Sequence, residues 1–97
     1  MNDEKIIELF NNRDERAIAE VQKKYGDICH SVSSPYLPSS EDREECINDA
    51  MLALWNSIPP ECPRSLFGYL TGIVRNLAKS RVRAASAQKR GGEVQTV

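Results

Sequence analysis

A stripe of fixed positive charge marks the segment between Arg75 and Arg83. Arg75, Lys79 and Arg83 are four residues apart, so they fall on one side of an α-helix, with Asn76 and Ser80 beside them. The apolar residues of the same segment also recur at helical spacing, and they are Leu66, Leu70, Ile73 and Leu77. The pattern predicts a helix that packs on a core with one side and presents cations, an amide and a hydroxyl group on another. The charged side of such a helix is suited to binding a polyanion.

The sequence offers little for catalysis or metal binding. Its one histidine is His30, and it contains no Gly-rich phosphate loop, GxSxG, HExxH or Ser–His–Asp set. Cys29, Cys46 and Cys62 are sixteen or seventeen residues apart without a CxxC pair, which argues against zinc. We therefore expect no enzymatic activity, no metal and no cofactor, and we expect the cysteines to be reduced, small core residues.

Length and composition indicate one globular domain. The chain has 97 residues, of which 40% are hydrophobic and 28% charged. No apolar run approaches the ~20 residues of a transmembrane helix, and the acidic start MNDEKII lacks the features of a secretion signal. We expect a cytoplasmic protein with no membrane contact.

The net charge of −1 conceals a strong asymmetry. Residues 1–62 carry six Lys/Arg and thirteen Asp/Glu, whereas residues 63–97 carry seven Lys/Arg and one Glu. This division favours two different partners, or an electrostatic contact between the two halves. Chance segregation of surface charges is the alternative.

Two helices are predicted before the first proline. Residues 3–10 form a short amphipathic helix, and Asn12 with Glu15 has the form of a capping box for a second helix over residues 13–32. Gly26 lies in the middle of this second helix, where it costs about 1 kcal/mol relative to alanine. A close neighbouring helix or a helix break is the usual reason for such a glycine.

Two more helices follow, separated by proline-containing loops over residues 33–40 and 59–64. Ser39 or Ser40 caps a third helix over residues 41–57, and Ser65 caps a fourth that continues to about Ala87. The predicted fold is all-α, a compact bundle of three main helices plus a short N-terminal helix. Residues 1–87 form the domain, and residues 88–97 form a flexible tail or the start of a linker.

The third helix has a core side and an outward side. Its core positions are Ile47, Met51, Leu54 and Ile58. The outward positions are Glu45, Asn48, Asp49, Leu52 and Asn56. Leu52 and Trp55 are more apolar than a free surface requires, so they mark a protein contact, or Trp55 simply flanks the core.

Two motifs in this order resemble region 2 of bacterial sigma factors, with the extracytoplasmic-function (ECF) type as the most similar subgroup. The first motif, residues 42–55, is DREECINDAMLALW, and the second, residues 65–79, is SLFGYLTGIVRNLAK. The resemblance covers about residues 17–83. Asn48, Met51 and Tyr69 depart from the pattern, because the family usually has Gln, Phe and often Trp at these positions.

The resemblance implies two binding faces. In such factors the acidic helix docks on the clamp helices of the RNA polymerase β′ subunit, a role that would fall to the outward residues Glu45, Asn48, Asp49, Leu52 and Asn56. The last helix and the loop before it bind the promoter −10 element and capture a flipped base of the non-template strand. The DNA-binding residues implied here are Arg64, Ser65, Tyr69, Arg75, Asn76, Lys79, Ser80 and Arg83.

Individual roles also follow from the resemblance. The loop over residues 59–65 would wall the base pocket, and Asn76 and Ser80 would hydrogen-bond a base edge. The arginines, with Arg81 among them, and Lys79 would hold phosphates. Phe67 and Tyr69 could stack on unpaired bases, and core packing is the alternative for each.

Two other functions remain open at this point. The chain could be a helical protein-interaction adaptor that uses Leu52 and Trp55, or a nucleic-acid-binding module without sequence preference. We expect a monomer, and an anti-sigma protein could cover either face. An ECF factor would continue into a second domain that reads the −35 element, and that domain is not in these 97 residues.

Overall fold

Four α-helices make up the part of the chain that the structure describes. The structure is a computed structural model that describes the backbone of residues 1–96 and the side chains of residues 1–86. The helices are α1 (Asp3–Asn11), α2 (Arg16–Ser33), α3 (Ser40–Ser57) and α4 (Leu66–Thr96). No strand occurs within residues 1–96, and the predicted all-α bundle is confirmed.

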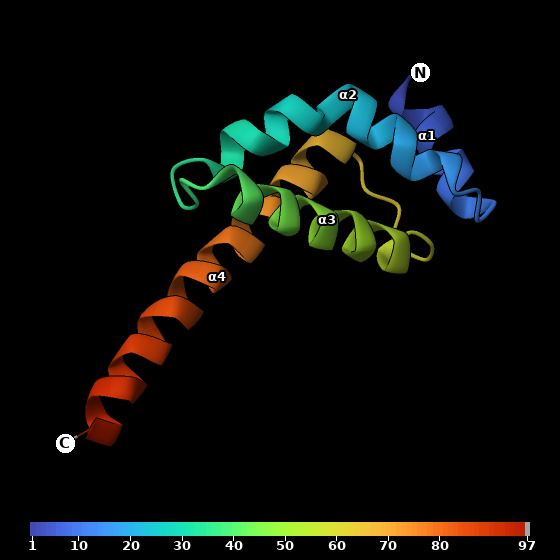
Figure 1. The fold of residues 1–97 in the computed structure, drawn as a ribbon. Helices are drawn as coiled ribbons and strands as arrows, with labels where there is room; N and C mark the ends of the chain where they lie inside the picture. Colours follow the sequence, from blue (N-terminus) through green and yellow to red (C-terminus); the bar gives the residue numbers. More distant parts are fainter. Residues whose placement is uncertain (97) are drawn as a thin grey trace.

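The last helix organises the bundle. α4 packs against both α2 and α3, α2 and α3 pack against each other, and α1 packs on α2. Beyond this contact α4 extends away from the other helices (Figure 1), which gives the molecule its extents of 55 × 25 × 21 Å. The helix continues past the end that was predicted near Ala87. The assignment of residues 88–97 to a tail or linker stays a prediction.

The buried side of α4 differs by one helical step from the predicted one. Leu66 and Leu70 are buried as expected, but Ile73 and Leu77 are only half-buried. The positions between the helices are taken by Val74 and Ala78. At this point the Cys46 thiol of α3 lies 3.7 Å from the Val74 carbonyl oxygen, so a side chain of α3 contacts the backbone of α4.

The connection between α1 and α2 is not the predicted capping box. Arg13 has a positive φ of 54°, its N–H donates to the Phe10 carbonyl and the Asp14 N–H donates to the Leu9 carbonyl, both at 2.9 Å. These two bonds form a Schellman motif that ends α1. α2 therefore begins at Arg16 rather than Arg13, and the Asp14 carboxylate accepts from the Arg16 N–H at 3.0 Å.

The predicted serine caps of the two later helices are present. The Ser39 hydroxyl accepts from the Asp42 N–H at 3.5 Å, and the Ser65 hydroxyl accepts from the Gly68 N–H at 3.0 Å. Each bond satisfies a backbone donor that the first turn of a helix leaves free. The cap at Ser65 fixes the point at which residues 59–65 join α4.

A polar cluster fastens α1 to α2. The Asp3 carboxylate accepts from the Tyr25 hydroxyl at 2.8 Å and from the Lys24 ammonium at 2.7 Å. Burial acts to raise the pKa of Asp3, but the hydrogen bonds from Lys24 and Tyr25 outweigh it and the pKa is lowered. The N-terminal helix is thus an integrated part of the bundle.

Candidate functional site

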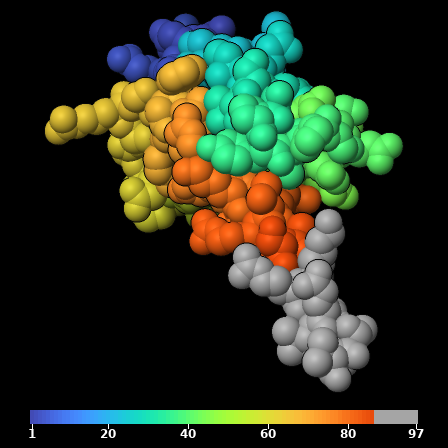
Figure 2. Space-filling model, turned by 90° about the vertical axis from the view of Figure 1, so that its left-hand side faces the viewer, coloured from blue at the N-terminus to red at the C-terminus, as the bar shows by residue number. Residues whose placement is uncertain are grey.

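The predicted polar side of α4 is exposed along its length. Arg75, Asn76, Lys79, Ser80 and Arg83 are all exposed. Successive residues of a helix are rotated by about 100°, so these five point away from the side that carries the buried core positions. The space-filling view shows this part of α4, in orange, emerging from between the other helices (Figure 2). The structure therefore places these five predicted DNA-binding residues on the side of α4 that faces away from the core.

The N-terminal end of α4 presents a second group of the predicted residues. Arg64 and Ser65 are exposed, and the Ser65 hydroxyl already accepts the bond that caps the helix. Phe67 is 46% exposed, and its ring centroid lies 6.0 Å from that of Tyr25 in a tilted arrangement. Tyr69 is half-buried against the core. Phe67 thus retains an accessible ring, whereas much of Tyr69 is used in packing.

Arg81 does not lie with the other α4 cations. It follows Ala78 by three residues, on the core side of the helix, and its guanidinium donates to the Asp49 carboxylate at 2.7 Å. A longer contact of 3.4 Å reaches Glu45. The hydrogen bond with Asp49 raises the pKa of Arg81 above its usual value. Arg81 therefore belongs to the acidic face of α3, and the structure separates it from the side chains expected to hold phosphates.

The outward side of α3 is exposed as predicted. Its exposed residues are Glu45, Asn48, Asp49, Leu52 and Asn56. Leu52 is 59% exposed, which is unusual for a large aliphatic side chain on an otherwise polar helix face. An acidic face with one apolar residue thus lies on α3, and a basic face lies on the neighbouring α4.

Both faces lie in a segment of the chain that matches a known protein family. The family model for sigma-70 region 2 matches residues 22–88, a stretch that covers most of the chain and includes both faces. The chain belongs to the sigma-70 region 2 family. No curated protein and no solved structure gave a match. Members of this family are non-enzymatic transcription initiation factors that bind RNA polymerase and promoter DNA.

An apolar hollow adjoins the exposed leucine of this region 2 domain. It has a volume of about 330 Å³ and is lined by Glu15, Ile18, Met51, Leu52 and Trp55. Trp55 is half-buried, and its ring centroid is 6.3 Å from that of Phe10. Trp55 therefore flanks the core, as one of the two alternatives expected, and it also borders the outward face of α3, while a protein contact of Trp55 stays a prediction.

The contacts of the Arg13 side chain with the end of α3 were not predicted from the sequence. Its guanidinium lies 3.8 Å from the centroid of the Trp55 ring and donates to the Trp55 and Ile58 carbonyl oxygens at 2.7 and 3.1 Å. These carbonyls are at the C-terminal end of α3, where backbone acceptors lack helical partners and a cation is favoured. Arg13 thus fixes the end of α3 and the start of residues 59–65. No local pattern could reveal it, because forty-two positions separate Arg13 from Trp55.

The loops of the region 2 domain differ in how they are held. Arg43 donates to the Leu37 and Pro38 carbonyl oxygens at 2.9 and 2.6 Å, which fastens the connection between α2 and α3. Residues 59–65 are mostly exposed, and they include Cys62. The expectation that all three cysteines lie in the core was therefore wrong for Cys62, while Cys29 and Cys46 are buried.

Among the described side chains of the domain, no three His, Cys, Asp or Glu residues lie close enough together to hold a metal ion. Within residues 1–96, no helix has the length and apolar character needed to cross a bilayer.

Proposed function

We propose that this sigma factor region 2 domain docks on the β′ clamp helices through α3 and captures the −10 element through α4 and residues 59–65. The observation that carries the proposal is the pair of oppositely charged, exposed faces on two helices packed against each other. A single rigid unit with this arrangement can hold polymerase and promoter DNA in a fixed relation.

The α3 face suits a basic helical partner. Glu45 and Asp49 are more than half exposed despite their contact with Arg81, so each carboxylate has room for another donor. Leu52 and the neighbouring hollow offer an apolar anchor inside this polar surface. Interfaces of this kind gain most of their affinity from a few buried apolar contacts, and charge supplies orientation and association rate.

The α4 face suits a single strand rather than a closed duplex. Arg75, Lys79 and Arg83 lie along the helix to meet phosphates, and Asn76 and Ser80 beside them can hydrogen-bond a base edge. Phe67 offers a partly exposed ring for stacking, worth about 1–3 kcal/mol per base. Tyr69 has less ring surface to offer, and its role in DNA binding stays a prediction.

Promoter melting by this domain would be thermodynamic capture. Extruding a base from the duplex costs a few kcal/mol, and contacts with the released strand offset that cost. The exposed loop over residues 59–65 is the part of the domain expected to border the flipped base. Because the isolated domain has few cations, we expect weak DNA binding that falls steeply with salt.

The decisive experiment measures binding between this chain and the isolated clamp-helix segment of a bacterial β′ subunit. Asp49→Arg reverses a charge at the centre of the α3 face, and Asp27→Arg makes the same change at an exposed position on α2. We expect Asp49→Arg to abolish binding and Asp27→Arg to leave it nearly unchanged. Absence of binding by the unaltered chain at high micromolar concentration would refute the polymerase contact.

An adaptor that binds protein through Leu52 and never touches DNA is the second candidate, and the exposure of Leu52 favours it. A transcription assay with Asn76→Ala and Lys79→Ala distinguishes the two, because an adaptor would tolerate both changes. A module without sequence preference would bind a −10-like strand and a scrambled strand equally. The ECF subtype, the cytoplasmic location, the monomeric state and an anti-sigma partner stay predictions.

A further inference from the structure

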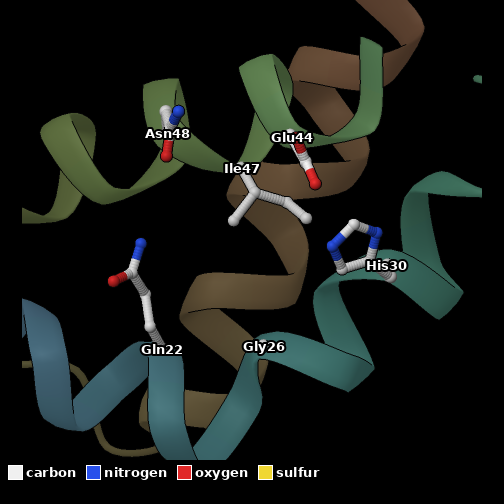
Figure 3. Close-up of a pocket in the computed structure, with 6 residues that line it drawn as sticks. All are labelled: Gln22, Gly26, His30, Glu44, Ile47 and Asn48. Carbon is white, nitrogen blue, oxygen red and sulfur yellow. The ribbon is translucent and has the colours of Figure 1, made fainter. Parts of the chain in front are cut away.

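A second hollow opens between α2 and α3, and its α3 residues lie about one helical turn before those of the Leu52 hollow. Its volume is about 190 Å³, and its lining residues are Gln22, Gly26, His30, Glu44, Ile47 and Asn48. Figure 3 shows Gln22 and Asn48 facing each other at one end and His30 facing Glu44 at the other. Ile47 lies between these pairs, opposite Gly26. The hollow is therefore apolar in the middle, with polar groups at both ends.

Gly26 is what keeps this hollow open. A Cβ atom built at Gly26 would meet nothing within 4 Å, and α2 continues unbroken through the position. Glycine is, after proline, the poorest helix former. Neither of the usual reasons for a mid-helix glycine, a close helix contact or a helix break, is therefore present at Gly26. At Gly68, by contrast, a Cβ would come within 3.3 Å of the Ser65 hydroxyl oxygen. The missing side chain at Gly26 leaves space that the fold itself does not use.

Glu44 places a carboxylate at one end of the hollow. Glu44 forms no ion pair with any of the side chains described, those of residues 1–86. The adjacent Arg43 forms no ion pair with Glu44, because its guanidinium donates to the Leu37 and Pro38 carbonyls and, from Nε, to His30 Nδ1 at 3.4 Å. A carboxylate at the end of an apolar hollow has the chemistry to bind a cation carried on an aliphatic stem.

We propose that this hollow receives an arginine or lysine side chain of the partner that docks on α3. Such side chains bury their methylene stems against apolar surface and keep the charged group at the edge. Ile47 and the open space at Gly26 would take the stem, Glu44 would pair with the charge, and the Gln22 and Asn48 amide oxygens could accept hydrogen bonds.

The position of the hollow connects it to the proposed polymerase contact. Asn48 lines the hollow and also belongs to the exposed face that carries Glu45 and Asp49. A partner helix seated on that face would therefore pass beside the opening. The inference rests on the proposed function, and it adds that the partner presents a basic side chain toward α2.

The test compares the affinity of the β′ clamp-helix segment for matched variants. Gly26→Leu fills the hollow, and Gly72→Leu makes the same change on α4, where a Cβ also meets nothing within 4 Å. Glu44→Lys reverses the charge at the hollow, and Asp27→Lys does so at an exposed α2 position outside it. We expect Gly26→Leu and Glu44→Lys each to raise Kd about tenfold or more, whereas the two controls stay within about twofold.

Three outcomes would contradict the inference. Wild-type affinity for both Gly26→Leu and Glu44→Lys would overturn the inference while leaving the polymerase contact intact. Loss of affinity with Gly26→Leu but not with Glu44→Lys would mean that an apolar side chain enters the hollow, which contradicts the proposed basic occupant. Failure of the unaltered chain to bind would refute the proposed function, and this inference with it. In the supporting case, the side-chain amide signals of Gln22 and Asn48 shift in NMR spectra when the segment binds.

Discussion

Arg81 of α4 donates a hydrogen bond to the Asp49 carboxylate of α3 at 2.7 Å. This contact comes from the core side of α4, so it separates Arg81 from the exposed stripe of Arg75, Lys79 and Arg83. The guanidinium is about one third exposed, and exposed ion pairs contribute about 0–1 kcal/mol. The pair therefore orients the acidic face more than it stabilises the fold.

The separation of Arg81 from Arg83 predicts different salt dependences for DNA binding. Arg83→Ala should reduce the slope of log K against log salt by about 0.7 on single-stranded DNA, because one phosphate contact is lost. Arg81→Ala should leave that slope unchanged, because Arg81 is paired with Asp49 on the other side of the helix. Fluorescence anisotropy with a labelled −10-like strand at several salt concentrations measures both. Equal slope changes in the two variants would contradict this assignment.

The sequence could place Arg75, Lys79 and Arg83 on one side of a helix, because spacing alone determines that relation. It could not place Arg81, since assigning a side chain to the core side requires knowing which apolar residues are buried. Ile73 and Leu77 suggested a core side rotated from the real one, which Val74 and Ala78 define. Ile73 and Val74 are adjacent and both strongly apolar, so the pattern did not distinguish them, and Ala78 gives only a weak hydrophobic signal.

Arg13 holds a backbone conformation that glycine adopts more readily. Its φ of 54° is left-handed, at the position of a Schellman motif where glycine is most common. The Arg13 side chain explains its presence there, since it bonds two carbonyls at the end of α3 and covers the Trp55 ring. Arg13→Ala loses these contacts and keeps the backbone cost, so we expect a loss of about 2 kcal/mol in unfolding free energy.

Arg13→Gly separates the two effects. It loses the same side-chain contacts but relieves the left-handed conformation, so it should be about 1 kcal/mol more stable than Arg13→Ala. Urea denaturation of the three proteins gives the comparison. An alanine variant as stable as the glycine variant would show that the backbone at Arg13 carries no cost.

The junction between α1 and α2 shows a second limit of sequence reasoning. Asn12 and Glu15 have the spacing of a capping box, and that pattern correctly indicated that one helix ends and another begins there. Backbone N–H groups of Arg13 and Asp14 close the junction instead, and the Arg13 side chain makes its contacts at the end of α3. A distant contact thus decided a local conformation.

Asn76 and Lys79 should differ in what they contribute to DNA binding. Both are exposed on α4, but an amide can distinguish base edges, whereas an ammonium group binds phosphates of any sequence. Asn76→Ala should reduce the preference for a −10-like strand over a scrambled one by about 1–3 kcal/mol. Lys79→Ala should weaken the binding of both strands by a similar factor. Preserved discrimination in Asn76→Ala would remove that residue from base recognition.

The three cysteines should react very differently with thiol reagents. Cys62 is exposed in the loop before α4, whereas Cys29 and Cys46 are buried. Burial raises the pKa of both buried thiols and lowers the fraction of reactive thiolate. We expect rapid labelling of one thiol in the native protein and of the other two only after unfolding, as followed by mass spectrometry. Cys62→Ser should abolish the rapid phase.

The buried thiol of Cys29 should make the free energy of unfolding depend on pH in the alkaline range. Burial, with a smaller effect from Cys46, raises the Cys29 pKa from 9.0 to about 11. Between these values the folded chain keeps a proton that the unfolded chain releases, so rising pH favours unfolding. The contribution of the Cys29 thiol to the free energy of unfolding is fully present below about pH 9. It is lost as the pH rises toward about 11, at about 1.4 kcal/mol per pH unit.

Cys29→Val tests this assignment, because valine fills a similar volume and does not titrate. Urea unfolding at a series of pH values should show a smaller alkaline slope for Cys29→Val than for the unaltered chain. The remaining slope belongs to groups such as Tyr25, whose pKa is raised by burial and by its hydrogen bond to Asp3. Identical slopes in the two proteins would mean that the Cys29 thiol ionises in the folded state as readily as in the unfolded chain. That result would require water to reach the centre of the bundle, where Cys29 has no exposed surface.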